Sequence, residues 1–231
     1  SDWTAETDLR TLTARKISVV VAQDGGGAGL ALFTSEGYSI TALGAALGAQ
    51  SKASVQQSIG NPANFNVSNG VELETLALAN GDLATDATIL GGLKDDGFLI
   101  LRKYLPSLAG SYFERVPCAV AITSDYAFIE NNRVVDKVRR LAEVALIPEL
   151  QKDILLNSDG TLTDDVIGYF SDLVSTQMEG MTANNEISAF SVAIDPSQDI
   201  LTTSILEVSI SVLPLGIAEF INVTIGLTTS I

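Results

Sequence analysis

The amino-acid sequence predicts a mixed α/β fold (α/β or α+β), in which a mixed β-sheet flanked by helices is followed by long antiparallel C-terminal strands. Three observations predict it: short apolar runs alternate with helical patterns early in the chain, two longer helical patterns follow, and strand-like runs fill residues 187–231. An alternation of strands and helices indicates a sheet with helices packed on its faces. The chain has 231 residues, of which 46% are hydrophobic, enough to bury a substantial core.

The first half of the chain supplies the alternation of strands and helices. The spacing of apolar residues predicts two helices within 39–59, with Ser39 and Ser51 as their N-caps. A third helix is expected over 85–94, with Asp86 in its first turn. Short apolar runs typical of strands are found at 17–22, 71–79, 97–102 and 118–123.

Two longer helices and three strands are expected in the second half. Ser124 is the predicted N-cap of the first helix, which continues to about Ile147 and ends at Pro148, because proline cannot continue a helix. The second helix starts near Thr163, with acidic residues in its first turn, and runs to about Met181. The expected strands are 187–194, 200–213 and 217–231.

These elements divide the chain into a core and two ends. Residues 1–16 are polar and are interpreted as a linker or an N-terminal arm, and residues 17–231 form the core domain. Within it, residues 217–231 form a C-terminal strand or arm.

Charge and hydropathy exclude several kinds of partner. The chain has 13 basic and 28 acidic residues, a net charge of −15, which repels a nucleic-acid backbone. A membrane-spanning helix needs about 18 or more consecutive apolar residues, and no run approaches this length. We therefore expect neither nucleic-acid binding nor membrane insertion.

The residues that most often carry chemistry are scarce. The chain has no histidine and one cysteine, Cys118, in an apolar run that predicts a buried small side chain. A triad of the serine or cysteine type therefore lacks its base, and a histidine or multi-thiolate metal site cannot form. No cofactor is expected. A mechanism based on carboxylates alone stays open, although no spacing among the acidic residues selects a pair.

Two short segments resemble ligand-binding loops but lack the required residues. Residues 24–30 are glycine-rich and follow a predicted strand, yet leucine stands where the last glycine of a dinucleotide-binding loop belongs. Residues 157–160 resemble the middle of a calcium loop, but its first and twelfth positions are Leu155 and Val166 rather than carboxylates. The first segment is interpreted as a connector and the second as a turn.

A dense polar cluster occupies residues 130–137 on the first long helix. One interpretation is a solvated helix face. The other is that Arg133, Asp136 and Lys137 meet charges on another element or on a neighbouring subunit. Both stay open from the sequence.

The last run, residues 217–231, alternates apolar and polar side chains with a period of two, which is typical of a strand with one apolar face. Fully extended, it spans about 50 Å, more than a domain of this size needs. It therefore either completes its own sheet as an edge strand or leaves the domain and pairs with the sheet edge of another molecule. The candidate interface residues on this face are Ile217, Ile221, Val223, Ile225 and Leu227, and Glu219 shares it.

Several segments together resemble the tail sheath proteins of contractile bacteriophages and related prophages. The resemblance covers roughly residues 15–231 and is strongest after residue 118. Residues 39–44 and 52–60 fit less specifically. The segments that carry it are 124–138, 146–150, 159–164, 186–192, 212–216 and 221–226.

The resemblance implies a structural protein and not an enzyme. Sheath subunits form a helical homo-oligomer around an inner tail tube protein and shorten to drive the tube through a cell envelope. They are located in the virion tail and assemble in the cytoplasm of the bacterial host. Their terminal arms add strands to the sheets of neighbours, and residues 217–231 are where that behaviour maps. Family chains are longer at the N-terminus, so either Ser1 begins an excised product or residues 1–16 are the arm.

Two other classes of function compete with this interpretation. One is a small acidic α/β enzyme with a carboxylate-based site, and the other is a surface or secreted binding domain. Electron microscopy separates them, because a sheath protein forms tubes and an enzyme forms discrete particles.

Overall fold

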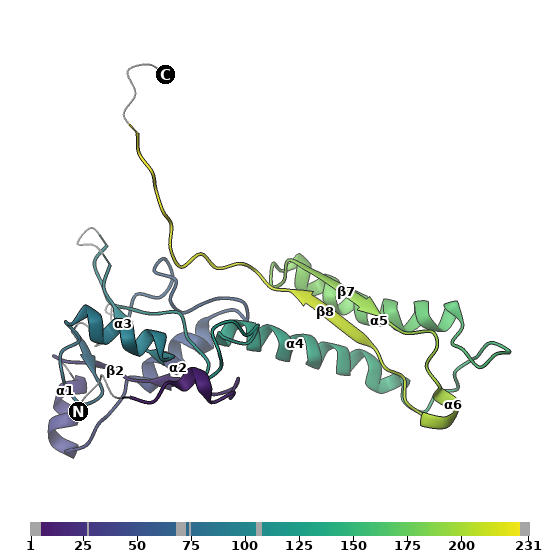
Figure 1. Ribbon diagram of the computed structural model, residues 1–231, viewed down its shortest axis with the longest axis horizontal. Helices are drawn as coiled ribbons and strands as arrows, with labels where there is room; N and C mark the ends of the chain where they lie inside the picture. The colour runs from purple at the N-terminus through teal and green to yellow at the C-terminus, as the bar shows by residue number, and fades with distance from the viewer. Residues whose placement is uncertain (1–5, 27, 68–72, 74, 105–107, 227–231) are drawn as a thin grey trace.

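A computed structural model describes residues 6–26, 28–67, 73, 75–104 and 108–226. The molecule is elongated, as Figure 1 shows: a body with three helices and short strands lies at one end, and a long helix leads from it into a second layered part. The chain then returns along this second part and leaves the body as an extended C-terminal segment.

The strands of the body are short and are paired two by two. Parallel and antiparallel pairs both occur, which together with the surrounding helices confirms a mixed α/β fold. The pairs are β1 (Val19–Val20) with β4 (Phe98–Leu99), parallel; β2 (Ala22–Asp24) with β3 (Leu76–Leu78), antiparallel; and β5 (Leu101–Arg102) with β6 (Tyr112–Phe113), antiparallel.

Three helices accompany these strands: α1 (Ala28–Glu36), α2 (Leu43–Lys52) and α3 (Ala87–Asp95). Asp86 caps α3 by accepting hydrogen bonds from the backbone of Thr88 and Ile89 at 2.8 and 3.3 Å. Two hydrophobic clusters form most of the core of the body. One includes Ile59, Phe65, Leu99, Leu101 and Phe113, and the other includes Leu9, Leu78, Leu93, Phe98 and Ala119. A smaller cluster contains Cys118, Val120 and Ala127.

Residues before the predicted core also contact the body. The short 3₁₀ helix η1 (Leu9–Thr11) buries Leu9, whose backbone N–H donates to the carbonyl of Asp96 at 2.9 Å. Ala14 forms an isolated β-bridge with Ala119. The described part of residues 1–16 therefore lies against the body.

The second part is built on two long helices. α4 (Ile129–Leu146) is followed by the 3₁₀ helix η2 (Ile147–Glu149), and α5 (Asp164–Ala183) packs against α4. Thr163 is the N-cap of α5, as predicted, because its side chain accepts from the backbone of Val166. The buried residues at this contact are Val134, Val138, Val174, Met178, Met181 and Ile187.

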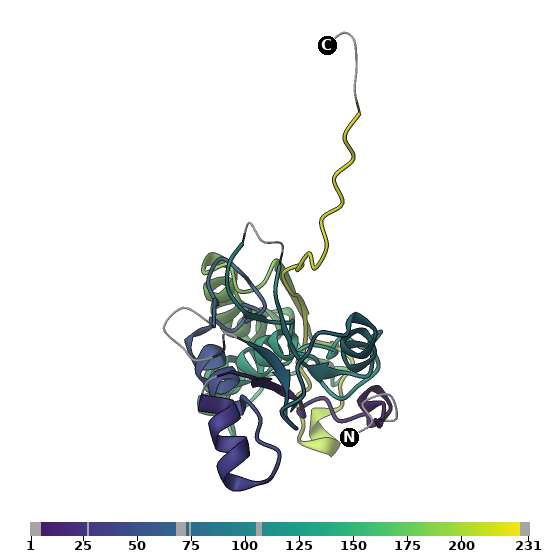
Figure 2. The same cartoon turned by 90° about the vertical axis from the view of Figure 1, so that its left-hand side faces the viewer.

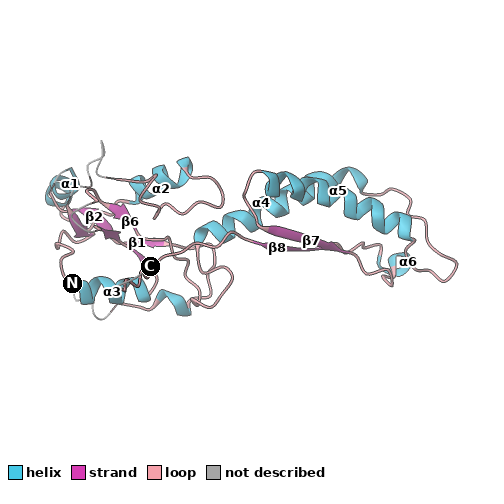
Figure 3. Cartoon of the chain, turned by 90° about the horizontal axis from the view of Figure 1, so that it is seen from above, coloured by secondary structure: helices cyan, strands magenta, loops and turns pink. Residues whose placement is uncertain are grey.

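A two-stranded ribbon covers these helices. β7 (Ala189–Ala193) pairs antiparallel with β8 (Ser209–Leu213), and the short helix α6 (Ile200–Thr203) lies between them in the sequence. Figure 3 shows the ribbon running beside α5 along the length of this part. Its inward side chains, which pack on the helices, are Phe190, Val192, Ile210 and Val212.

The predictions for the helix within 39–59 were partly wrong. α2 follows Ala42, and Ser39 does not cap it. Ser51 lies within α2, where its hydroxyl donates to the carbonyl of Gly48 at 2.8 Å, and it caps no second helix. The chain turns extended at Ala53, which is buried with Ile59 in the core, so tertiary packing replaces the predicted helix there.

The prediction around residues 118–124 was also wrong. Residues 118–123 form no strand and contribute only the bridge at Ala119. Ser124 accepts from the backbone of Tyr126 at 3.2 Å in a turn, and α4 begins later, at Ile129. A local side-chain hydrogen bond thus competes with helix initiation at Ser124.

Two further predictions, a connector and a strand, differ from the structure. Residues 24–30 were interpreted as a connector, but α1 begins within them, at Ala28. Leu30 and Leu32 are both exposed on α1, so the helix has no amphipathic stripe from which it could be predicted. Residues 200–213 are not one strand, because Asp199 caps the short α6 and only the last five residues pair with β7.

Candidate subunit interface

The C-terminal segment is the first candidate interface. Residues 217–226 belong to no strand of the described chain and project away from the body (Figures 1 and 2). Ile221, Val223 and Ile225 expose 83%, 74% and 85% of their surface. Ile217 is partly buried against the body, and Leu227 lies outside the described residues. The segment 217–226 is called the arm below.

The β7–β8 ribbon is the second candidate. Within the described residues each of its strands has one partner, so both outer edges lack a neighbouring strand. An unpaired edge presents backbone N–H and C=O groups that can accept another strand.

A hydrophobic groove of about 390 Å³ adjoins the β8 edge, between β8 and α4. Its walls are mainly aliphatic, and the aliphatic residues are Val135, Val138, Ala142, Leu146, Val208 and Ile210. Arg139 and Glu143, which form an ion pair with each other, also line it. Exposed Ile147 of η2 and Leu150 directly after η2 extend it. The groove and the edge together form a surface suited to an extended apolar segment.

The polar cluster on α4 has partners inside the chain. Lys137 donates to Glu186 at 2.6 Å, and Lys16 donates to Asp136 at 3.0 Å. Arg133 donates to the backbone carbonyls of Ala53 and Ser54 at 2.9 and 3.2 Å. The three residues thus join α4 to other elements of the same chain, and their role at a subunit contact stays a prediction.

A further ionic network, which the sequence did not predict, surrounds Arg115. Its guanidinium donates to Glu130 and, at 3.2 Å, to Glu219 of the arm, and it lies 3.5 Å above the ring of Phe128. Burial raises the pKa of Glu130, which is 2% exposed, and the positive charge of Arg115 opposes this shift. The signal in the sequence was Glu219 itself, a charged residue on the apolar face of an alternating run.

No candidate metal site is found among the described residues. Within them, no group of three or more histidine, cysteine, aspartate or glutamate side chains is placed to hold a metal ion. Cys118 is buried, which raises the pKa of its thiol. Residues 157–160 form a turn, as predicted, in which Asp159 accepts from Thr161. No helix in the described ranges has the length and apolar character needed to cross a bilayer.

Comparisons with known proteins identify one matching family and two similar solved structures. The family described as DUF2586, C-terminal domain, matches residues 125–231. The helical sheath of the anti-feeding prophage, in its contracted state, has a TM-score of 0.53 at 13% identity over 74% of this chain. The baseplate of the same prophage has a TM-score of 0.47 at 12% identity, over 68% of this chain and 43% of the other. A comparison with curated proteins gave no match.

The likeness to the sheath establishes the fold. This chain spans 45% of the length of that sheath chain, so the two share a part and not a whole.

Proposed function

We propose that this chain is a structural subunit of a contractile tail sheath, which polymerises helically around an inner tail tube and contracts to drive it through a cell envelope. One pair of surfaces carries the proposal. Residues 221–226 of the arm are exposed and are not covered by any part of the described chain, and the same chain has an open β-edge beside an apolar groove. The likeness to a prophage sheath supports it.

The arm and the groove have matching chemistry. In an extended strand alternate side chains share a face, so Ile221, Val223 and Ile225 point the same way. A strand added to the edge of β8 hydrogen-bonds through its backbone and directs this face over the groove between β8 and α4. The backbone pairing supplies strength, and the alternation of apolar and polar side chains along the arm sets the register of the pairing.

The two surfaces of one chain do not meet. The arm continues from the end of β8 but runs away from the ribbon, as Figures 1 and 2 show. Donor and acceptor are therefore different surfaces, and a contact between them joins two copies head to tail. A heterologous contact of this kind, repeated without closing, produces a helical filament.

The net charge is compatible with assembly through this contact. Copies that each carry −15 repel one another. From Phe220 to Gly226 the arm has no charged residue, and the groove is mainly aliphatic. The contact therefore brings apolar surfaces together and separates most of the like charges. We infer an assembly role rather than catalysis, with an inner tube protein as the second partner.

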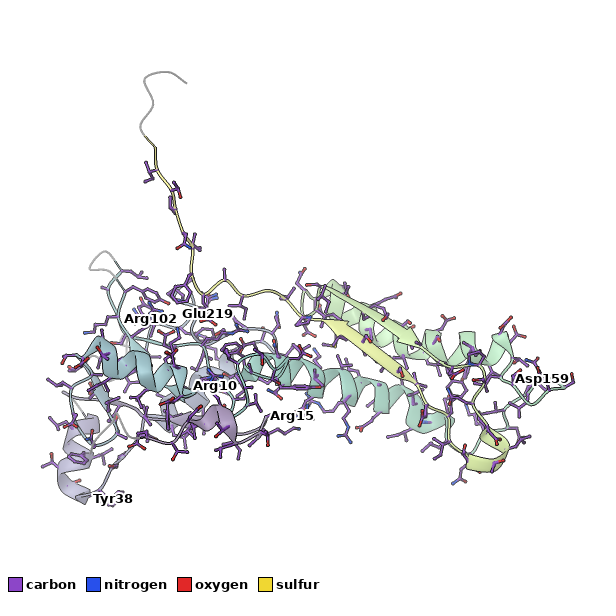
Figure 4. All side chains as sticks on the ribbon, viewed as in Figure 1. Arg10, Arg15, Tyr38, Arg102, Asp159 and Glu219 are labelled. Atoms are coloured by element: carbon purple, nitrogen blue, oxygen red, sulfur yellow. The ribbon has the colours of Figure 1, made fainter. Side chains whose placement is uncertain are left out.

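Electron microscopy of the purified chain tests the proposal. The intact protein is expected to form tubes or filaments, and a variant lacking Ile217–Ile231 is expected to stay as discrete particles. A variant with the acidic turn residue Asp159 changed to Asn serves as the control, because this residue is exposed and lies at the end of the molecule opposite to Glu219 (Figure 4). Normal filaments from the truncated chain would overturn strand donation, and discrete particles with enzymatic turnover would favour the competing enzyme.

A further inference from the structure

Residues 214–219, called the root below, lead from β8 into the arm and include its first three residues. Residues 215–219 line one side of a hollow of about 530 Å³, and Arg102, Tyr104 and loop residues 54–62 line the other. A second hollow, of about 690 Å³, is lined by Glu219 and Phe220 together with Phe98 and Phe128. Arg115 and Glu219 line both hollows. Residues 215–219 therefore border open space, and Glu219 stands where the two hollows meet the chain.

Direct bonds hold the root at its two ends. At the start, the hydroxyl of Ser188 donates to the carbonyl of Pro214 at 3.1 Å, beside the last pairing of the ribbon. At the end, Glu219 accepts from Arg115 at 3.2 Å and lies 3.6 Å from the ammonium of Lys94. Phe220 adds a contact, because the same ammonium lies 5.2 Å from its ring. Figure 4 shows Glu219 where the chain leaves the body, near Arg102.

The cations that hold Glu219 are themselves fixed. Arg115 is bound on its other side by the buried carboxylate of Glu130 and lies against the ring of Phe128. Lys94 is bound by Glu114 at 3.3 Å, and Glu114 also accepts from Arg102 at 3.0 Å. A preorganised cation loses little side-chain entropy when it binds a carboxylate. The side chain of Glu219 is 27% exposed, so solvent screens these ion pairs only in part.

The charge of Glu219 is conspicuous in its surroundings. It is the one charged residue between Ile217 and Ile231, and it occupies the face that otherwise holds apolar side chains. A strand that needed only to fill an apolar groove would have no use for a carboxylate at this position. Glu219 lies where the chain leaves the body, next to the cations of Arg115 and Lys94, which indicates a role other than filling the groove.

We propose that Glu219 is a positioning residue: Arg115 and Lys94 clasp it, and this clasp sets the direction in which the arm leaves the body. Residues 214–219 are then held at both ends, and the free part of the arm begins at Ile221, after the contact of Phe220 with Lys94. The clasp presents the arm to a neighbour in one orientation and so lowers the entropy lost when it docks. That consequence rests on the proposed function, whereas the orientation of the arm can be measured without assembly.

Distance measurements between two spin labels test the clasp. One label is attached at Thr224→Cys on the arm and the other at Lys52→Cys on α2, both exposed positions. Labelled protein is diluted with unlabelled protein, so that every measured distance lies within one subunit. The test variant is Glu219→Gln, which keeps the shape and removes the charge. The control is Glu179→Gln, an exposed residue of α5 that makes no ion pair within the described chain.

The expected result is a narrow distance distribution for the parent protein and for Glu179→Gln. For Glu219→Gln the width should increase by about twofold, because the arm regains rotational freedom at its root. In the parent protein about 1 M salt, with a Debye length of about 3 Å, should produce a similar broadening. A distribution that is broad already in the parent, or equally narrow in both variants, would overturn the clasp. Unchanged melting of Glu219→Gln would distinguish loss of position from loss of fold.

Substituting Arg115 gives a weaker test. Without it the buried carboxylate of Glu130 loses its positive partner, and the body itself is destabilised.

The distance distribution and the assembly of the Glu219→Gln variant separate the clasp from the proposed function. Failed assembly with a narrow distance distribution in this variant would contradict the clasp and leave strand donation intact. A broad distribution with normal assembly would support the clasp and show that orientation is not required for docking.

Discussion

Lys137 of α4 donates to both carboxylate oxygens of Glu186, at 2.6 and 2.5 Å, and so joins the long helix to the segment that leads into β7. Both side chains are largely shielded from water. The pair holds the start of the ribbon against the helix that forms the floor of the groove. Ribbon and groove therefore depend on an ion pair inside one subunit.

Replacing Lys137 with Met should lower the free energy of unfolding by about 1–3 kcal/mol, because Glu186 then keeps a shielded charge without its partner. Urea unfolding measures the change. Arg139→Met is the matched control, since both side chains of its pair with Glu143 are exposed, at 75% and 48%, and the pair should matter little. Loss of assembly with unchanged unfolding in Lys137→Met would instead assign Lys137 to a contact between subunits.

Glu130 should give the body a measurable pH dependence. Burial raises its pKa in the folded state above the ordinary value, so between the two values the folded protein holds a proton that the unfolded chain releases. The free energy of unfolding contributed by Glu130 therefore falls as the pH rises through this window. Comparing Glu130→Gln with the parent over the range above the ordinary glutamate pKa should show the difference, and parallel curves would contradict it.

The contact between α4 and α5 should dominate the stability of the second part. Met178 is fully buried in it, and Met178→Ala should cost about 2–5 kcal/mol through lost burial and the cavity left behind. Thr176→Ala on the exposed side of the same helix is the control, with an expected change within about 0.5 kcal/mol. Equal unfolding midpoints for the two variants would show that this interface is not a packed core.

The two faces of the arm should behave differently. Ile225→Asp should abolish or strongly weaken assembly, because it places a charge on the face that fills the groove. Thr224→Asp, one residue away on the opposite face, should assemble almost normally. Both residues are exposed, so neither change should alter the melting temperature. Equal loss of assembly by both variants would argue against docking as a β-strand.

The sequence predicted the elements whose signals are local. A helix was expected to start near Thr163, which is the N-cap of α5. Asp86 was expected in the first turn of a helix, and it is the N-cap of α3, one position earlier. Ser124 carries the same local signal but is held in a turn, so its role depended on the surrounding fold. α1 lacks an amphipathic stripe and could not be predicted from periodicity.

The candidate interface was harder to predict, because its defining contacts join distant residues. A period of two describes a strand equally well within its own sheet and on a neighbour, so residues 217–226 left both possibilities open. Arg115 and Glu219 are separated by 104 positions, and no local pattern connects them. The groove likewise requires α4 and β8 to be placed together before it exists.

A disulfide trap between two copies tests the central claim most directly. One tagged copy carries Thr224→Cys on the arm, and a second copy with a different tag carries Ser209→Cys on β8; both positions are exposed, whereas Cys118 is buried. Mild oxidation of the mixed protein should give a crosslinked species with both tags, and a partner with cysteine at exposed Ser35 on α1 should give none. Absence of a crosslinked species with both tags, or equal crosslinking to Ser35→Cys, would contradict donation of the arm to the β8 edge of a neighbour.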